Sequence, residues 1–595
     1  MHRNTKALSE GEFDILIIGA GAFGAAAARD AALRGLRTAL IERADFGGGT
    51  SAECFKMVHG GIRYLQHADI PRLRASCHER SALLRIAPHL VHPLPIAIPT
   101  YGYGQSGKAF LGAGACAYDL LTMGRNAGIS DPERRVGRTR FLSRAEVLAL
   151  FPHLRARALT GAVVFEDGQM YNPARLVLAF VKGAVAAGAT ACNYLEAQSF
   201  LWEGDAVRGV RVRDQLNGEC FDVRARLTLN AAGPWADYLQ QDPERFGTQQ
   251  RAPFSRDAYF IVDRPPTSPY GVAVQGLSRD KDALLGRATR HLFAAPWRDK
   301  TLLGVWHRLF PDSPDAACIE PDEIEQWLFE LNAVYPELSL SSSEVTFANF
   351  GLVPFGDTAT ESELSFGKES RLIDHRSVHG VHGLVSLVGI RFTTARADAG
   401  RALDLLLQQS PLRAASVATD RLPLPGGDID DFQAFQIRAH CAEIAIDSHA
   451  LDALLRNHGA EYWQVLDCAN GARASRIAGT TTLCAELWHA VDREMAMHLE
   501  DVVMRRTDLA AGAHPGRPAL EEAATLMGER LAWSTRRIRD EIVATERTLA
   551  RHLARPGAAR SDGAMLANGP ANSTGGKSEH SVVDLAERRS VQIRA

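Results

Sequence analysis

Three features of the sequence predict an α/β fold with an additional helical domain. Near the N-terminus, two short apolar runs flank a glycine-rich turn and a helix-compatible stretch. Further along, apolar and charged residues alternate with period two, which is typical of half-buried strands. From about residue 430 onward, apolar residues recur at three- and four-residue steps, as they do in helices. We therefore expect a Rossmann-like nucleotide-binding domain with an antiparallel-sheet region, followed by a mostly helical C-terminal domain.

The N-terminal segment has the order strand, tight turn, helix and strand. The apolar run 13–18 leads into a glycine motif, and a helix-compatible stretch, 25–35, follows the motif. The glycines of the motif are Gly19, Gly21 and Gly24. A second apolar run, 38–41, stops at Glu42, which lies 23 residues after the first glycine. This spacing is typical of a βαβ unit that binds a dinucleotide.

Each motif residue has a physical task in such a unit. Gly19 permits the tight turn, Gly21 lets backbone amides approach a pyrophosphate, and Gly24 lets the helix pack closely on the strand. The helix N-terminus offers free N–H groups and a partial positive charge to the phosphates. Glu42 can accept hydrogen bonds from ribose hydroxyls. The alternative is a βαβ unit whose glycines serve packing alone. The position of the motif near the N-terminus favours FAD in a large flavoprotein fold.

Further motifs follow along most of the chain. They lie at 43–51, 56–65, 85–93, 229–236, 296–297, 383–394 and 494–507. With these motifs the chain resembles the aerobic, FAD-dependent glycerol-3-phosphate dehydrogenase family, whose members typically show GDF-x-x-GTS followed by K-L-I-H-G-G-L-R-Y-L. The resemblance implies FAD as the cofactor and a site assembled from segments far apart in the sequence.

Composition and charge narrow the function class. A chain of 595 residues exceeds what one hydrophobic core usually serves, so at least two domains are expected. The net charge of −3 argues against nucleic-acid binding. Nine scattered cysteines without a CxxC pair favour reduced thiols and predict neither a disulfide framework nor a metal site. The N-terminus lacks a signal-peptide core, and no apolar run reaches membrane-spanning length. We expect a cytoplasmic protein, soluble or peripheral on the inner face of the membrane.

The sequence also suggests domain boundaries. The predicted parts are an N-terminal extension (1–11), an interleaved FAD and substrate domain (12–425), a helical C-terminal domain (426–554) and a disordered tail (555–595). A Pro- and Gly-containing linker at 422–429 separates the two large domains. The alternating stretches 206–213 and 302–306 are predicted as strands of the substrate-side sheet, and 485–497 is predicted as a helix. The tail has almost no aromatic residues, which is typical of disorder.

The resemblance identifies residues that would hold the flavin. The segment 49–51 matches the family's flavin-contacting loop, where small residues let backbone amides approach the ring. The predicted cofactor-binding residues are Gly19, Gly21, Gly24, Glu42, Gly49, Thr50, Ser51, Gly233, Gly389 and Thr393.

Five side chains are candidates for substrate chemistry. His59 is the first candidate for a general base, because an imidazole titrates near neutral pH; the alternative is a histidine that only packs against or hydrogen-bonds the cofactor. Arg63 and Tyr64 match the family's arginine–tyrosine pair, which suits an anion and a hydroxyl. Arg371 matches an arginine that the family uses near the substrate phosphate, with an ordinary solvated charge as the alternative. Arg391 stands at the lysine of the family's G-G-K-x-T-T turn.

The substrate side departs from the family pattern at several positions. Val353 replaces a phosphate-binding arginine, and Tyr259 stands where the family often has a histidine proposed to assist catalysis. Removing one arginine from a phosphate clamp weakens binding by about 10- to 100-fold unless another group compensates. His307, Arg308 and Arg391 are cations that could compensate or could define a pocket for a different anion.

Three functions therefore remain open at this point. The first is an FAD-dependent dehydrogenase of glycerol 3-phosphate or a related polyol phosphate, which passes electrons to a quinone. The second is a flavin dehydrogenase or oxidase of a different hydroxy or amino compound. The third is a flavin-binding redox partner without turnover. The resemblance also implies peripheral membrane contact, and a homodimer is possible.

Overall fold

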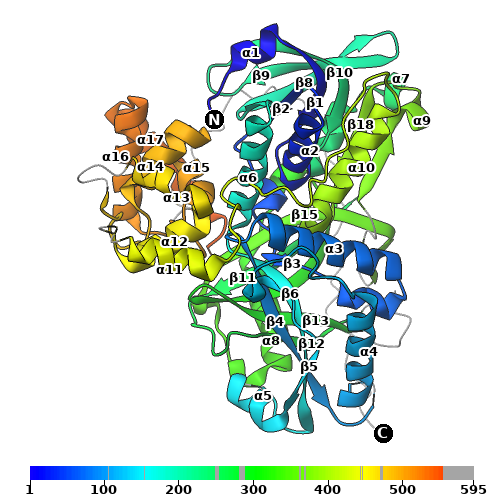
Figure 1. Ribbon diagram of the computed structural model, residues 1–595, viewed down its shortest axis with the longest axis vertical. Helices are drawn as coiled ribbons and strands as arrows, with labels where there is room; N and C mark the ends of the chain where they lie inside the picture. Colours follow the sequence, from blue (N-terminus) through cyan, green and yellow to red (C-terminus); the bar gives the residue numbers. More distant parts are fainter. Residues whose placement is uncertain are drawn as a thin grey trace, which may run out of the picture. The chain divides into compact units, whose positions relative to one another are not determined.

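The computed structural model describes residues 1–553 apart from a few short stretches (Figure 1). The stretches left out are residues 105, 153, 248–252, 280–288, 361–362, 367–369, 443, 445 and 469–473. The described residues pack as one compact unit. The predicted disordered tail, 555–595, lies outside the described residues.

An eight-stranded sheet carries the N-terminal glycine motif. Its strands are β1 (Glu12–Ile18), β2 (Thr38–Ile41), β7 (Thr190–Cys192), β8 (Leu195–Glu203), β9 (Ala206–Asp214), β10 (Cys220–Asn230), β17 (Arg371–Asp374) and β18 (Leu384–Val388). The main path is β17-β18-β10-β1-β2-β7, and the central pairs from β18 to β7 are parallel. Because parallel strands end at the same edge, the residues that follow β1, β2, β10 and β18 meet there. This edge is where such a sheet binds its nucleotide.

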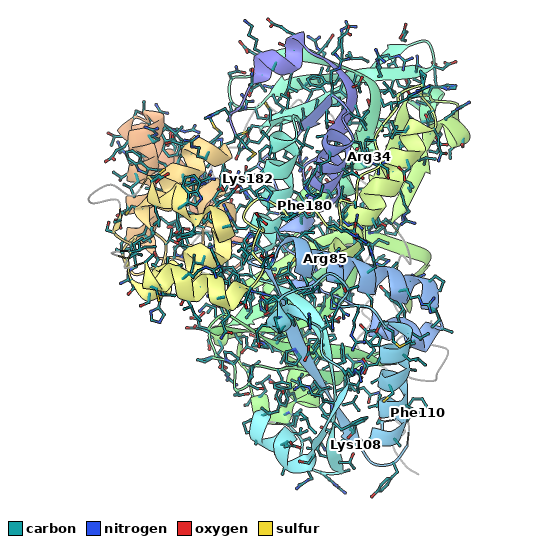
Figure 2. The ribbon with its side chains drawn as sticks, viewed as in Figure 1. Arg34, Arg85, Lys108, Phe110, Phe180 and Lys182 are labelled. Carbon is teal, nitrogen blue, oxygen red and sulfur yellow. The ribbon has the colours of Figure 1, made fainter. Side chains whose placement is uncertain are left out.

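Three helices pack on this sheet, namely α2 (Ala22–Leu33), α6 (Pro173–Ala186) and α10 (Ala395–Leu407). α2 contacts both α6 and α10, and its buried alanines, 25–28, keep the contact close. Arg34, labelled in Figure 2, follows α2 and pairs with Asp30 at 2.8 Å and with Asp404 of α10 at 2.5 Å. The remaining helices before the C-terminal region are α1 (Thr5–Glu10), α3 (Ile70–Ile86), α4 (Lys108–Leu121), α5 (Arg144–Leu150), α7 (Pro243–Phe246), α8 (Pro321–Val334) and α9 (His375–His379).

A second, ten-stranded sheet is mostly antiparallel. Its strands are β3 (Met57–Val58), β4 (Val91–Tyr101), β5 (Arg140–Ser143), β6 (Leu159–Met170), β11 (Phe254–Val262), β12 (Gly271–Arg279), β13 (Thr289–Trp297), β14 (Lys300–Phe310), β15 (Val345–Thr360) and β16 (Glu363–Phe366). The predicted strand 302–306 belongs to this sheet, within β14. The predicted strand 206–213 does not: it forms β9, which pairs with β8 and β10 of the first sheet. Alternation of apolar and charged residues indicates that a strand is half-buried, but tertiary contacts determine which strand it pairs with.

The C-terminal region is helical, as predicted (Figure 1, yellow to orange). Its helices are α11 (Phe432–Cys441), α12 (Ser448–His458), α13 (Tyr462–Leu466), α14 (Cys484–Glu494), α15 (Leu499–Asp501), α16 (Arg517–Leu531) and α17 (Thr535–Ala550). The predicted helix 485–497 corresponds to α14, which ends at Glu494 because Met495 adopts a left-handed backbone with φ of 57°.

Buried ion pairs connect the helical region to the nucleotide-binding region. Asp45 accepts hydrogen bonds from Arg505 at 2.8 Å and from Arg506 at 2.7 Å. Burial alone would raise the pKa of Asp45, but the two guanidinium groups hold it below its usual value. Arg175 of α6 pairs with Glu494 of α14 at 2.6 Å. Removing one partner of such a buried pair typically costs about 3–5 kcal/mol, so these contacts fix the helices against the sheet.

Candidate active site

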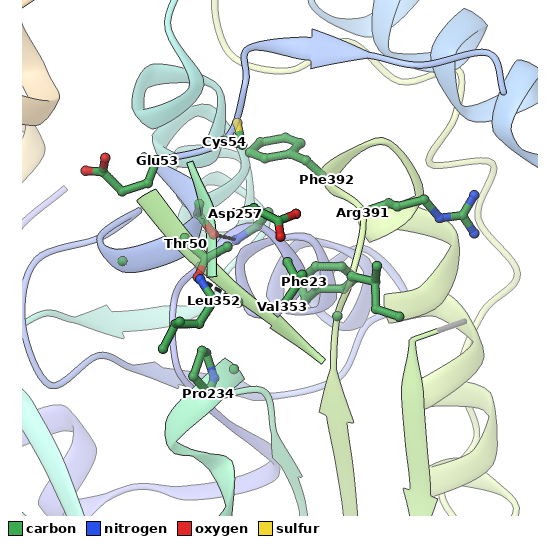
Figure 3. A pocket seen from close by; sticks show the side chains of 18 of the residues that line it. Phe23, Thr50, Glu53, Cys54, Pro234, Asp257, Leu352, Val353, Arg391 and Phe392 are labelled. Carbon is green, nitrogen blue, oxygen red and sulfur yellow. Dashed lines mark hydrogen bonds between the residues drawn. The ribbon is translucent and has the colours of Figure 1, made fainter. Parts of the chain in front are cut away.

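A cavity of about 1000 Å³ is lined by residues of both sheets. The turns at the carboxyl ends of β1, β2, β10 and β18 line it, together with residues of β11, β14 and β15. Figure 3 shows part of its wall, with Thr50 and Leu352 joined by a hydrogen bond and Asp257 nearby. The two predicted halves of the site, nucleotide and substrate, therefore belong to one cavity.

The predicted glycines build the start of this cavity. Gly19 has φ of +94°, and a Cβ there would lie 2.7 Å from the carbonyl oxygen of Ala231. A Cβ on Gly24 would lie 1.8 Å from the carbonyl oxygen of Gly19, so only glycine lets α2 pack this close to β1. Gly21 is the N-cap of α2 and lines the cavity. The N-terminus of α2 thus faces the cavity, which fits the diphosphate of a dinucleotide.

A carboxylate and a hydroxyl hold this turn in shape. Glu42, directly after β2, accepts hydrogen bonds from the backbone N–H groups of Ala20 at 2.7 Å and Ala44 at 3.0 Å. Burial raises the pKa of Glu42 despite these two bonds. The Ser51 hydroxyl accepts from the N–H of Ala22 at 2.9 Å. The acidic residue predicted for the ribose therefore lines the cavity beside the helix N-terminus.

The other predicted cofactor residues reach the same cavity from distant segments. Thr50 Oγ1 donates to the carbonyl oxygen of Leu352 at 3.0 Å, which joins its loop to β15. A Cβ on Gly389 would lie 1.9 Å from the ring of Phe23, so a side chain at this position would displace that ring. Further predicted residues on the cavity wall are Gly49, Ser51, Gly233 and Thr393.

His59 lines the cavity, and its imidazole contacts a buried carboxylate. Its side chain is 49% exposed, and its Nδ1 lies 3.5 Å from the buried carboxylate of Asp167. Asp167 also accepts from the N–H of Gly60 at 2.5 Å and from Arg80 at 2.8 Å. Burial would raise the pKa of Asp167, but the hydrogen bond from His59 and the charge of Arg80 lower it below its usual value. An ionised Asp167 orients the imidazole with Nδ1 turned away from the cavity.

An unneutralised cation lies on the same wall. Arg391 donates to the hydroxyls of Tyr64 at 2.7 Å and Ser76 at 2.9 Å, and among the described side chains no carboxylate pairs with it. Arg72, by contrast, is paired with Asp69 at 2.8 Å. Arg391 is therefore the better candidate to bind an anionic substrate group.

The other two predicted arginines are Arg63 and Arg371. The side chain of Arg63 lies outside the described part of the chain. Arg371 begins β17, opposite Val388, and it is not among the residues that line the cavity.

The positions that depart from the family pattern do line the cavity. Val353, Tyr259 and His307 come from β15, β11 and β14 respectively. The Tyr259 hydroxyl accepts from Lys56 Nζ at 2.5 Å, and burial lowers the pKa of Lys56 to about 8. Arg308, suggested as a compensating cation, is not on the cavity wall and pairs with Glu323 at 2.9 Å.

Some cavity residues have no signal in the sequence. Asp167, Asp257 and Arg72 are charges within ordinary strand or helix patterns, and only the folded arrangement brings them to the wall.

One group of potential metal ligands lies in the helical region, although the sequence predicts no metal site. The group consists of His458, His489 and Glu494. Arg175 donates to His458 Nδ1 at 3.1 Å, and this cation disfavours a metal ion there.

Comparison with known proteins supports this picture. Residues 14–397 match the family model described as FAD dependent oxidoreductase, and residues 417–538 match the C-terminal domain of alpha-glycerophosphate oxidase. The chain is 30% identical to a glycerol-3-phosphate dehydrogenase of Synechocystis, covering 85% of this chain and 91% of that protein. It is 32% identical to the human mitochondrial glycerol-3-phosphate dehydrogenase, covering 88% of this chain and 71% of that protein.

A solved structure has the same fold. The glycerol-3-phosphate dehydrogenase from Bacillus halodurans, crystallised with FAD, superposes with a TM-score of 0.71 at 24% identity, covering 92% of this chain and 96% of that chain. The predicted combination of nucleotide-binding sheet, antiparallel sheet and helical C-terminal domain is thereby confirmed.

Proposed function

This chain belongs to the FAD-dependent glycerol-3-phosphate dehydrogenase family, and we propose that it oxidises glycerol 3-phosphate or a related polyol phosphate to the ketone. The cofactor is FAD, and the glycine cradle, the α2 N-terminus and Glu42 are the groups that would hold it. When bound, FAD supplies a two-electron acceptor for hydride.

One observation carries the proposal. The cavity that contains the nucleotide cradle also contains a histidine oriented by a carboxylate and an arginine whose partners are neutral hydroxyls. A secondary alcohol needs a base for its hydroxyl proton, and a phosphate needs a cation. His59 and Arg391 offer both within one cavity.

In the proposed reaction, substrate binding and proton transfer are carried out by different residues. Arg391 and Tyr64 bind the phosphate and orient the substrate, so that its hydroxyl meets His59 Nε2. As the carbon–hydrogen bond breaks and its electron pair leaves as hydride, the hydroxyl proton passes to Nε2 and the carbonyl double bond forms. Asp167 stabilises the resulting imidazolium, because its carboxylate lies 3.5 Å from Nδ1.

A second candidate substrate class follows from the altered wall. Val353 offers no charge to a phosphate, and Asp257 adds a carboxylate to the cavity. These two residues favour a different hydroxy or amino compound in place of a short, doubly charged phosphate ester.

The electron acceptor in this proposal is a membrane quinone. No helix in the described part of the chain has the length and apolar character to cross a bilayer. α4 nevertheless exposes Phe110 and Leu120, and the turn after it exposes Met123, with exposed fractions of 43%, 64% and 75%. Lys108 and Phe110 are labelled on α4 in Figure 2. An apolar face beside a lysine suits the surface of an anionic membrane.

Anaerobic reduction of the purified flavoprotein tests the proposal. Glycerol 3-phosphate or a longer polyol phosphate should bleach the flavin absorbance, and a soluble quinone should restore it faster than oxygen does. Bleaching by an unphosphorylated hydroxy or amino compound alone would favour the second substrate class. Restoration by oxygen at the same rate would argue against the quinone.

A further inference from the structure

A second histidine–aspartate pair lies on the sheet wall of the cavity. His307 Nδ1 donates to Asp257 Oδ1 at 2.7 Å, and the Ser255 hydroxyl donates to the same oxygen at 2.7 Å. Asp257 and His307 both line the cavity, and their side chains remain 27% and 15% exposed. An acceptor-only carboxylate that is still partly exposed can take further hydrogen bonds.

The strand register places this pair close to the predicted flavin loop. Asp257 lies opposite His307 on β14 and opposite Gly351 on β15. A Cβ on Gly351 would lie 2.9 Å from the methyl group of Thr50, so this part of β15 touches the 49–51 loop. Figure 3 shows Asp257, Thr50 and Val353 on the same part of the wall.

The pair also belongs to the same compartment as His59. Tyr259 is two residues from Asp257 on β11, about 7 Å along the strand, and it lines the same cavity. Tyr259 accepts a hydrogen bond from Lys56, which precedes His59 by only three residues. Both histidine–aspartate pairs therefore line one cavity.

The charges of the two walls differ. Arg391, shortly after β18, has hydroxyl partners, whereas the sheet wall presents the Asp257 carboxylate beside the apolar Val353. The neighbouring Arg308 pairs with Glu323 and is not on the cavity wall. A phosphate is attracted to the first wall and repelled by the second, while hydroxyl groups are good donors to a carboxylate.

We propose that Asp257 and His307 bind the hydroxylated end of the substrate opposite the phosphate, so that this enzyme prefers a four- or five-carbon polyol phosphate to glycerol 3-phosphate. This rests on the proposed function. The pair acts on specificity: it holds extra hydroxyls that a three-carbon substrate lacks, whereas His59 takes the proton of the reacting hydroxyl.

The test compares glycerol 3-phosphate, erythritol 4-phosphate and ribitol 5-phosphate in anaerobic flavin reduction. The unaltered enzyme should show the higher kcat/KM with a longer substrate. Asp257→Asn and His307→Asn should lower that preference by about 10- to 100-fold, mainly through KM, with unchanged FAD absorbance. Asp263→Asn is the matched control, because Asp263 is 68% exposed, pairs with Lys300 and does not line the cavity.

The outcomes separate this inference from the proposed function. If no polyol phosphate bleaches the flavin, the proposed function fails. If glycerol 3-phosphate is preferred, or if both variants lower kcat/KM equally for all three substrates, the proposed function stands and the proposed hydroxyl subsite is wrong. A preference for an amino phosphate over the hydroxy phosphate of equal length would also overturn it.

Discussion

The two ends of the cavity are built in different ways. The nucleotide end starts from the backbone and a few small or acidic residues of one βαβ unit, with Gly19, Gly24 and Glu42 inside a short stretch of chain. The substrate end consists of side chains from distant segments, including His59 and Arg391. The first end depends on local geometry that tolerates almost no change. The second can be altered residue by residue while the fold persists.

The largest effect is expected from a substitution in the glycine motif at the nucleotide end of the cavity. Gly24→Val places a side chain where a Cβ would already lie 1.8 Å from the Gly19 carbonyl oxygen. We expect loss of bound FAD and a large fall in the thermal unfolding midpoint, measured by flavin absorbance and calorimetry. Gly114→Ala is the control, since nothing lies within 4 Å of a Cβ there. A yellow, stable Gly24→Val protein would contradict the packing argument.

The next effect is at the substrate end and should leave the nucleotide end intact. His59→Gln should slow flavin reduction by about 10²- to 10⁴-fold, because the hydroxyl proton loses its acceptor. FAD affinity should stay unchanged, as measured by titration and stopped-flow absorbance. His382→Gln, at an exposed histidine outside the cavity, is the control. An unaltered reduction rate would remove His59 from the mechanism.

A smaller effect is expected at the anion-binding residue. Arg391→Met should raise KM for a phosphorylated substrate by about 10- to 100-fold, with a lesser change in kcat, because a charge-assisted bond to the phosphate is lost. Arg308→Met should change KM less than twofold, because Arg308 pairs with Glu323 and does not line the cavity. Equal effects of the two substitutions would mean that the phosphate does not bind at Arg391.

Particular residues illustrate how far the sequence could predict this site. Gly19, Gly21 and Glu42 lie on the cavity wall because their roles are fixed by spacing within one supersecondary unit. Arg371 matches a family motif, yet it begins β17 and is not among the residues that line the cavity. The strand at 206–213 was predicted correctly but assigned to the wrong sheet.

Other residues could not have been found from their neighbours in sequence. Asp167 supports His59 from β6, and Asp257 meets His307 across two strands. Nothing in the sequence around either carboxylate distinguishes it from a solvated strand residue. Their function depends on which side chain lies opposite, and strand register decides that.

By itself the sequence determined the dinucleotide-binding βαβ unit and the helical C-terminal region, since glycine spacing and apolar periodicity act over a few residues and specify local backbone geometry. Only the tertiary structure decided which charges face the substrate. Hydrogen bonds and ion pairs form between side chains that the folded sheets bring within a few ångströms, and such contacts leave no periodic trace along the chain.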